Sequence, residues 1–332
     1  AIISIPALNH LRGRAPDDDL RILTNQPVME RAAPLESIFE NTPFYSGIYT
    51  LPPGGGSLFD IWDTLYKIRL WGPDRLVYLS EPSSPMKLVR EYMFFRSCGI
   101  RYFTAFPVGR SLRTYHENGT LRWEPEHARL LRAVSAARED GPDWTYEFDA
   151  EKSKEADSIL ATWPGRHHFL ALSIGAKLPD KDWGDKNWAL VLDQLAVYDS
   201  SLGIMAIGAG EEKDRIGALL DDWPGPLLNL CGATSPVTSA LVMRAAKFYL
   251  GHDSGPMHLA ALTGLRCVAV FSARAKPGVW FPHGKGHEVL YPWHETDAVP
   301  PKTGLRTAGG SILSITVDDV VGACKKVLSC AG

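Results

Sequence analysis

Apolar and polar residues follow one another along this chain in a strand-and-helix rhythm. Between short apolar runs, apolar residues recur at helical spacing; Leu58, Ile61, Trp62, Leu65 and Ile68, for example, share one face of a predicted helix. Strands that alternate with helices predict parallel sheets covered by helices, so we expect an α/β fold. The predicted strands are 21–24, 47–51, 75–79, 100–105, 169–174, 203–207, 248–250 and 267–271, and the predicted helices include 58–70, 85–95, 124–138, 187–198, 211–220, 236–245, 257–263 and 316–328.

The length of the chain and the positions of its Gly and Pro residues predict two domains. The chain has 332 residues, enough for about two domains of ~150 residues each. Gly and Pro interrupt the pattern at 140–143 and 163–166, which places the domain boundary near 150–165. We therefore expect a first domain over 1–155, a second over 156–315, and a terminal helix over 316–332 that packs toward the first domain.

Composition excludes several classes of protein. Hydrophobic residues make up 45% of the chain and charged residues 22%, which are ordinary values for a globular protein. The net charge of −3 argues against a general nucleic-acid-binding protein. The sequence contains no apolar run of the ~18–20 residues that span a bilayer. Five cysteines without a Cys-x-x-Cys pair favour a reducing compartment, so we expect a cytoplasmic protein.

The most informative segment is a polar turn between an apolar strand and a helix. The strand ends in Asp253-Ser254-Gly255, and Pro256 suits the first turn of a helix because no amide donor is needed there. Free amides and the positive end of the helix dipole make such a turn a site for an anion, typically a phosphate. His258 lies in the first helical turn and is expected to point to the same place.

The likeness of this segment to a known family is specific. From Asp253 the chain reads Asp-Ser-Gly-Pro-Met-His-Leu-Ala-Ala, and an apolar strand and Trp-Phe-Pro-His-Gly at 280–284 follow. This order resembles the donor-site signature of glycosyltransferase family 9, which contains the ADP-heptose:lipopolysaccharide heptosyltransferases. The resemblance covers most of 169–290, and the first half only in layout and in one Pro-Ala-Leu helix. It implies a GT-B fold, in which two Rossmann-like, doubly wound domains face each other across a cleft.

The resemblance brings further segments to the donor site. Lys186 precedes Trp188 at the start of a helix and is preferred over nearby Lys181 as the lysine that neutralises the donor diphosphate. Asp253 is expected to orient turn amides, Lys186 or a sugar hydroxyl, and Glu211 or Glu212 faces the ribose or simply favours a helix start. The implied donor-binding residues are Gly175, Ala176, Lys177, Lys186, Gly208, Glu212, Gly232, Thr234, Asp253, Ser254, Gly255 and His258.

The implied reaction is an inverting, metal-independent transfer of a sugar from a nucleoside diphosphate to a cell-surface glycan. An ADP-sugar, ADP-heptose above all, is the favoured donor, and no other cofactor is implied. No metal site is expected, because the acidic run at 17–19 is typical of a solvated turn. In the family the catalytic base is an aspartate near an N-terminal Gly-Asp turn. That turn has no counterpart here, so the base is unassigned and expected upstream of Ala1.

Basic residues of the first half suggest the acceptor. Arg12, Arg14, Arg110 and Arg113 suit an anionic glycan or glycolipid such as the lipopolysaccharide core, although each is more typical of a solvated surface. Such an acceptor implies peripheral contact with the inner face of a bacterial inner membrane.

Two alternatives stay open. The unmatched Gly-Asp turn allows a catalytically impaired protein that binds a nucleotide sugar. A sugar-nucleotide epimerase of GT-B fold is the other, although that class usually has more acidic residues in its cleft than this sequence offers.

Overall fold

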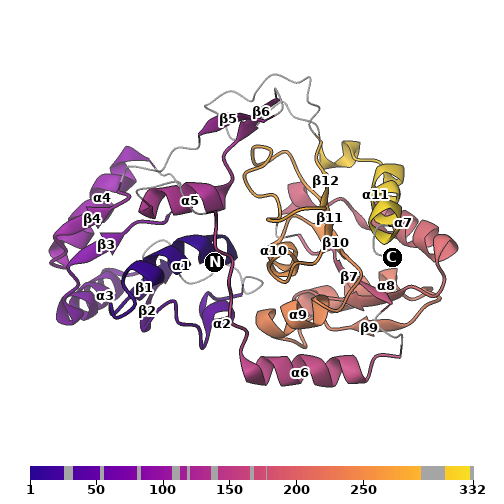
Figure 1. Cartoon of the computed structure of the whole chain (residues 1–332), viewed down its shortest axis with the longest axis horizontal. Coiled ribbons are helices and arrows are strands. Elements are labelled where there is room, and N and C mark those ends of the chain that lie inside the picture. Colours follow the sequence, from indigo (N-terminus) through magenta and orange to yellow (C-terminus); the bar gives the residue numbers. More distant parts are fainter. Residues whose placement is uncertain are drawn as a thin grey trace. The chain divides into compact units, whose positions relative to one another are not determined.

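The computed structural model describes residues 1–332 except 26–32, 53–55, 81–83, 107–112, 118–119, 136–140, 165–167, 177, 293–310 and 330–332. The chain forms two compact units, one of residues 1–115 and 124–147 and one of residues 116–123 and 148–332 (Figure 1). Where the sequence predicted a boundary, near 150–165, the structure has helix α6 (Ala150–Ala161), which begins in the second unit. The Asp149 side chain caps α6 by accepting hydrogen bonds from two backbone N–H groups of its first turn.

The second unit is built on a six-stranded parallel sheet. Its strands are β7 (Phe169–Ser173), β8 (Gly203–Ala206), β9 (Leu227–Asn229), β10 (Tyr249–His252), β11 (Cys267–Val270) and β12 (Glu288–Leu290). They lie in the order β12-β11-β10-β7-β8-β9. Every residue of β7, β8, β10 and β11 is buried, which is why these strands show as largely apolar runs in the sequence. The predicted α/β fold with a parallel sheet is confirmed.

Helices complete the core of the second unit. α7 (Asp185–Tyr198), α8 (Lys213–Leu219) and α11 (Val317–Ser329) share one hydrophobic cluster with alternate strand residues such as Leu172, Leu250 and Val270. α9 (Pro236–Met243) contacts both α6 and α10 (Gly255–Leu262). The terminal helix α11 packs on α7, β11 and β12, whereas the sequence analysis placed it toward the first domain.

The first unit carries its strands in separate pairs. β1 (Arg21–Asn25) pairs in parallel with β2 (Gly47–Leu51), and β3 (Arg75–Val77) with β4 (Tyr102–Thr104). Each pair is a sheet of its own among the described residues. A further two-stranded sheet consists of β5 (Thr114–Glu117), which crosses from the first unit into the second, and β6 (Thr120–Trp123), which belongs to the second unit. The helices are α1 (Ile5–Arg14), α2 (Glu36–Phe39), α3 (Leu58–Trp71), α4 (Pro85–Ser97) and α5 (Glu126–Val134).

Helix α3 corrects one detail of the predicted pattern. Ile68 packs in a core cluster with Leu65, as predicted, but Leu58 and Trp62 of the predicted buried face are exposed. The Ser57 side chain accepts from the N–H of Asp60 in a capping box, and the helix starts at Leu58, the predicted first residue. Among the described residues, none of the helices combines the length and apolar character needed to cross a bilayer.

Candidate functional site

The carboxyl ends of β7 and β10 form the switch point of the second sheet. From β7 the chain continues to β8 on one side, whereas β10 adds on the other side and leads to β11. In open parallel sheets, ligands bind beyond the strand ends at the point where the direction of strand order reverses. The segments after β7 and β10 contain Gly175 and Asp253, two predicted donor-site residues, so the topology brings them to one edge.

His252, the last residue of β10, fixes the geometry of this edge. Its Nε2 accepts a hydrogen bond from the backbone N–H of Trp183 at 3.0 Å, so Nδ1 carries the proton that it donates to the carbonyl of Ile174 at 2.9 Å. The imidazole is 1% exposed, and the Trp188 ring meets it edge-on with 5.0 Å between ring centroids. Through these contacts His252 ties the segment before α7 to the ends of both central strands.

The segment that His252 holds presents a lysine to the switch point. Lys181 ends a short 3₁₀ turn (Pro179–Lys181), and its Nζ lies 2.7 Å from Oδ2 of Asp253. The Trp183 ring anchors the same segment, because it is fully buried and its Nε1 donates to the carbonyl of Ile315 at 3.0 Å. The ion pair therefore joins Lys181, on a turn that Trp183 anchors, to Asp253, the residue after β10.

Lys186, the lysine preferred from the sequence, occupies a different place. It is exposed in the first turn of α7, after the buried Trp183. Asp253, which the sequence predicts to orient turn amides, Lys186 or a sugar hydroxyl, pairs with Lys181 in the structure. Lys186 stays a prediction as a donor-binding residue, and Lys181 is the better candidate by geometry.

The start of α10 leaves its first amides available. Ser254 occupies the N-cap position, but its side chain makes no capping hydrogen bond, and the first turn of the helix contains no acidic residue. The Ser254 hydroxyl lies 3.4 Å from the hydroxyl of the buried Tyr249. Gly255 is exposed and His258 is half-buried beside it in the first turns of the helix. An uncapped N-terminus of this kind suits a phosphate.

Glu212 lies on the other side of β7. Its carboxylate accepts the backbone N–H of Ala209 at 3.0 Å. A Cβ at Gly175 would lie 1.8 Å from the carboxylate, and one at Gly208 would lie 2.3 Å from it. The glycines at both strand ends therefore make room for this side chain, which sits within reach of a ligand at the switch point.

The remaining predicted donor residues follow β9. Gly232 adopts φ +72° and packs its Cα against Gly210, so it closes the glycine turn after β8. The Thr234 hydroxyl is hydrogen-bonded to that of Ser239 at 2.7 Å, in front of α9. Ala176 is half-buried after β7, and Lys177 lies outside the described residues.

The arginines predicted for the acceptor lie in the first unit. Arg12 donates from Nη1 to the carbonyls of Pro16 and Asp18, so it holds the turn after α1. Arg14 and Arg113 are exposed, and Arg110 lies outside the described residues. The structure does not assign these residues to a common site.

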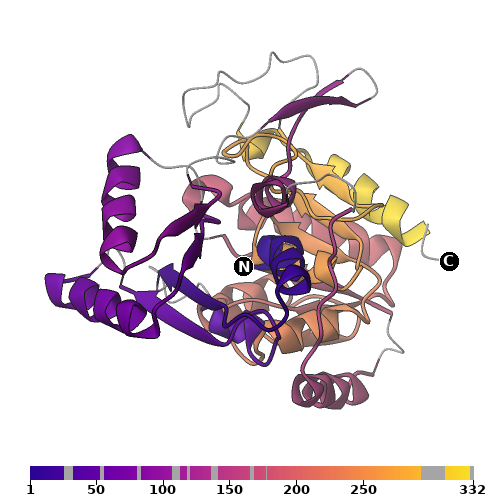
Figure 2. The same cartoon turned by 60° about the vertical axis from the view of Figure 1, so that its left-hand side comes forward.

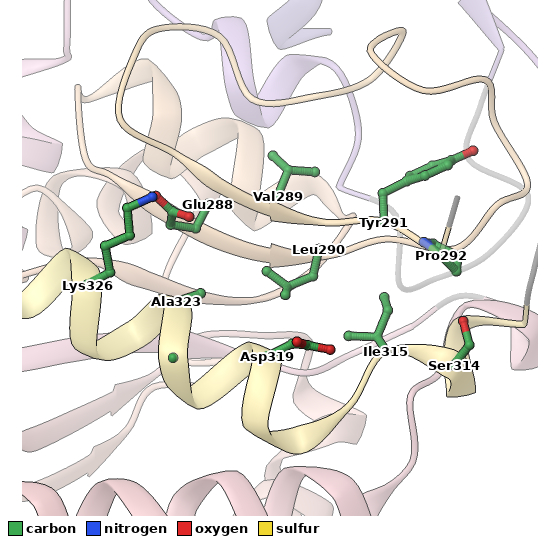
Figure 3. Close-up of a pocket in the computed structure, with 11 residues that line it drawn as sticks. Glu288, Val289, Leu290, Tyr291, Pro292, Ser314, Ile315, Asp319, Ala323 and Lys326 are labelled. Carbon is green, nitrogen blue, oxygen red and sulfur yellow. The ribbon is translucent and has the colours of Figure 1, made fainter. Parts of the chain in front are cut away.

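A pocket of about 370 Å³ lies elsewhere in the second unit, between β12 and α11. Leu290, Tyr291, Ile315 and Asp319 line it, and Lys326 pairs with Glu288 at 2.8 Å at one end (Figure 3). None of the predicted donor residues contributes to its wall.

The described part of the chain gives little support for metal-dependent or thiol chemistry. There, no cluster of His, Cys, Asp and Glu has the arrangement of a metal site. Burial raises the pKa of the Cys98 thiol to about 11 and that of Cys231 to about 12, so neither is a reactive thiolate near neutral pH.

Burial of His252 predicts a loss of stability in acid. Desolvation lowers its pKa from 6.5 to about 4, although the charge of Asp182 acts in the opposite direction. Because the folded-state pKa is below the unfolded value, the contribution is complete above pH 6.5 and is lost as the pH falls toward 4. The full shift corresponds to about 3 kcal/mol. The free energy of unfolding, measured in urea between about pH 7 and about pH 4, should fall more steeply with decreasing pH in wild type than in His252→Gln. Parallel pH curves of the two proteins would contradict the lowered pKa of His252.

Sequence reasoning missed His252 and ranked Lys181 second. A histidine that ends an apolar strand gives no local sign that both ring nitrogens bind backbone groups. Trp183 was the available signal for Lys181, because a large apolar residue two positions away anchors a turn.

Comparisons with known proteins identify the family to which the chain belongs. The family model described as glycosyltransferase family 9 (heptosyltransferase) matches residues 122–298, and a search of curated proteins gives no match. A family 9 glycosyltransferase from Veillonella parvula DSM 2008 has a similar structure, with 16% identity, TM-score 0.71, and coverage of 99% of this chain and 93% of the other.

Two Escherichia coli structures resemble the chain as well. ADP-heptose LPS heptosyltransferase II shares 16% identity with TM-score 0.65, covering 99% of this chain and 95% of the other. Heptosyltransferase WaaC with ADP shares 14% sequence identity with this chain at a TM-score of 0.58, and the match covers 100% of this chain and 96% of the other. At these identities the structures show a common fold, GT-B. Because the family model spans more than half of the 332 residues, the chain belongs to glycosyltransferase family 9 (heptosyltransferase) and is a glycosyltransferase.

Proposed function

We propose that the protein transfers heptose from ADP-heptose to the lipopolysaccharide core or another cell-surface glycan. The transfer is a single inverting displacement that needs no metal ion. The observation that carries the proposal is the Lys181–Asp253 pair beside the uncapped start of α10, at the switch point of the sheet. Support for the donor comes from the similar fold of an E. coli heptosyltransferase solved with ADP and with ADP-2-deoxy-2-fluoro heptose.

In this proposal the donor diphosphate lies between Lys181 and the first turn of α10. As the sugar leaves, negative charge grows on the diphosphate, and a fixed ammonium and helix amides stabilise it. Asp253 holds the lysine in place before the donor arrives. Glu212, whose half-buried side chain lies against the glycine turns after β7 and β8, accepts hydrogen bonds from the ribose hydroxyls.

The same proposal covers acceptor and location. The acceptor hydroxyl attacks the anomeric carbon from the side opposite the diphosphate, and Arg12, Arg14, Arg110 and Arg113 stay candidates for its anionic groups. A glycolipid acceptor places the enzyme in the bacterial cytoplasm, at the inner face of the inner membrane. Four cysteines that are free and buried in the structure are compatible with a reducing compartment.

Calorimetric titration with ADP, GDP and UDP, first without metal and then with Mg²⁺, tests the donor site. We expect selective binding of ADP without metal, weakened about tenfold or more in His258→Ala, because that side chain lies in the first turns of α10. Equal thermal stability of the variant serves as the control for folding. Absence of binding to all three nucleotides, or binding that depends on Mg²⁺, would overturn the proposal.

A further inference from the structure

Two helices of the first unit expose large apolar side chains on one face each. On α3 these residues recur every four positions, and Phe59 beside them is 77% exposed. On α4 they recur at three and four positions, and Met86 is 83% exposed. We call this surface the α3–α4 face; it consists of Leu58, Phe59, Trp62, Tyr66, Leu70, Met86, Val89, Tyr92 and Met93.

The two helices are neighbours, so the α3–α4 face spans both. They contact each other, and Nη1 of Arg69 in α3 donates to the carbonyl of Ser97 at the end of α4 at 3.0 Å (Figures 1 and 2). The opposite sides of both helices are already packed, because Ile68 and Phe95 belong to one core cluster. Monomeric proteins seldom leave so many adjacent large apolar side chains in water unless the surface has a partner.

Three arginines lie within the α3–α4 face. Arg69 lies seven positions after Trp62, Arg90 four after Met86, and Arg96 three after Met93, so helical spacing places each arginine on the apolar side. All three are exposed. Within the described chain, no carboxylate forms an ion pair with Arg90.

The acidic residues of the two helices already have hydrogen-bond or ion-pair partners. Asp60 accepts from the N–H and hydroxyl of Ser57 at the start of α3. Asp63 pairs with Lys67 at 2.6 Å, and Glu91 pairs with Lys87 at 3.7 Å and accepts the hydroxyl of the buried Tyr78. The α3–α4 face therefore combines apolar and aromatic side chains with uncompensated positive charge.

We propose that the α3–α4 face docks on a bilayer that contains anionic phospholipids. Trp62, Tyr66 and Tyr92 suit the headgroup level, where a ring has one apolar and one polar end, while Phe59 and Met86 reach the acyl boundary. Each arginine near an anionic surface adds attraction that salt weakens. A two-fold dimer through this face would bring the arginines of both copies together, so a second copy fits it less well.

This inference rests on the proposed location at a membrane and names the surface of the first unit that makes the contact; it does not depend on which sugar is transferred. The test is flotation of the full chain with phosphatidylcholine vesicles, with and without about 30% phosphatidylglycerol. We expect binding to the anionic vesicles only. Phe59→Glu and Met86→Glu should each weaken it about tenfold or more, and Arg90→Glu about fivefold with a smaller response to salt.

Val197→Glu is the matched control, since Val197 is 90% exposed on α7 of the second unit and should bind vesicles like wild type. Equal loss in this variant, or no binding of wild type to anionic vesicles, would overturn the inference. A wild-type dimer in light scattering that Phe59→Glu converts to monomer, without vesicle binding, would assign the face to self-association instead. ADP titrations of the same variants should be unchanged, so a failure here is separate from a failure of the donor proposal.

Discussion

Replacing Lys181 by alanine should lower kcat/KM for sugar transfer by ~10²–10³-fold, the range expected when one preorganised group that stabilises developing charge is removed. The lysine sits 2.7 Å from Asp253 on a turn that a buried histidine and a buried tryptophan hold, so its ammonium group is preorganised for this role. Steady-state kinetics with ADP-heptose and a core-saccharide acceptor measure the effect. Lys181→Arg should retain more activity than Lys181→Ala, because the positive charge remains.

Lys186→Ala is the matched control for this result. Lys186 is exposed five residues later, and its loss should change kcat/KM by less than about threefold. Because Lys181→Ala leaves the Asp253 carboxylate unpaired, the double variant Lys181→Ala/Asp253→Ala separates a lost cation from a gained repulsion. A large loss in Lys186→Ala with near-wild-type kinetics in Lys181→Ala would return the role to Lys186.

Gly251→Ala should lower the free energy of unfolding by about 3 kcal/mol or more. A Cβ at this position of β10 would lie 2.0 Å from the carbonyl oxygen of Ser173 in β7 and 2.6 Å from the Tyr249 hydroxyl. The first of these atoms is backbone in a strand that pairs with β10, so it cannot move without disturbing the centre of the sheet. Urea unfolding of the full chain, followed by circular dichroism, measures the loss.

Gly322→Ala provides the comparison for that measurement. Gly322 lies in α11, where a Cβ would meet no atom within 4 Å, so alanine should leave stability unchanged or raise it by up to about 1 kcal/mol. Similar stabilities of the two variants would contradict the close approach of β10 to β7.

Much of the second unit could be predicted because its strands are buried on both faces. Continuous apolar runs such as 169–174 and 267–271 then identify strands without knowledge of their partners, and the glycine turns that follow them identify the ligand edge. The first unit offered weaker signals. β3 and β4 are shorter than predicted, and α5 starts only at Glu126, after Pro125 in its N-cap position.

The choice between two lysines could not be made from local sequence. Lys181 and Asp253 are 72 positions apart, and their contact depends on His252 holding a short turn that has no helical periodicity. The resemblance, through Trp188, favoured Lys186, but Trp188 packs on His252 and Trp183 inside the protein, whereas Lys186 is exposed. The exposed side of α3 was missed for a related reason, since both of its faces carry apolar residues.

The strand order of the second unit also bears on how the protein folds. β7 pairs with β8 through one crossover, whereas the bond between His252 and Ile174 at the β10–β7 seam joins residues 78 positions apart. Closing a long loop costs more entropy than closing a short one, so local pairings are expected to form before this seam. The edge that would receive the donor is then among the last parts of the unit to assemble. A nucleotide that binds at this edge would slow unfolding. It would contact the segments after both β7 and β10, whose pairing is expected to separate early.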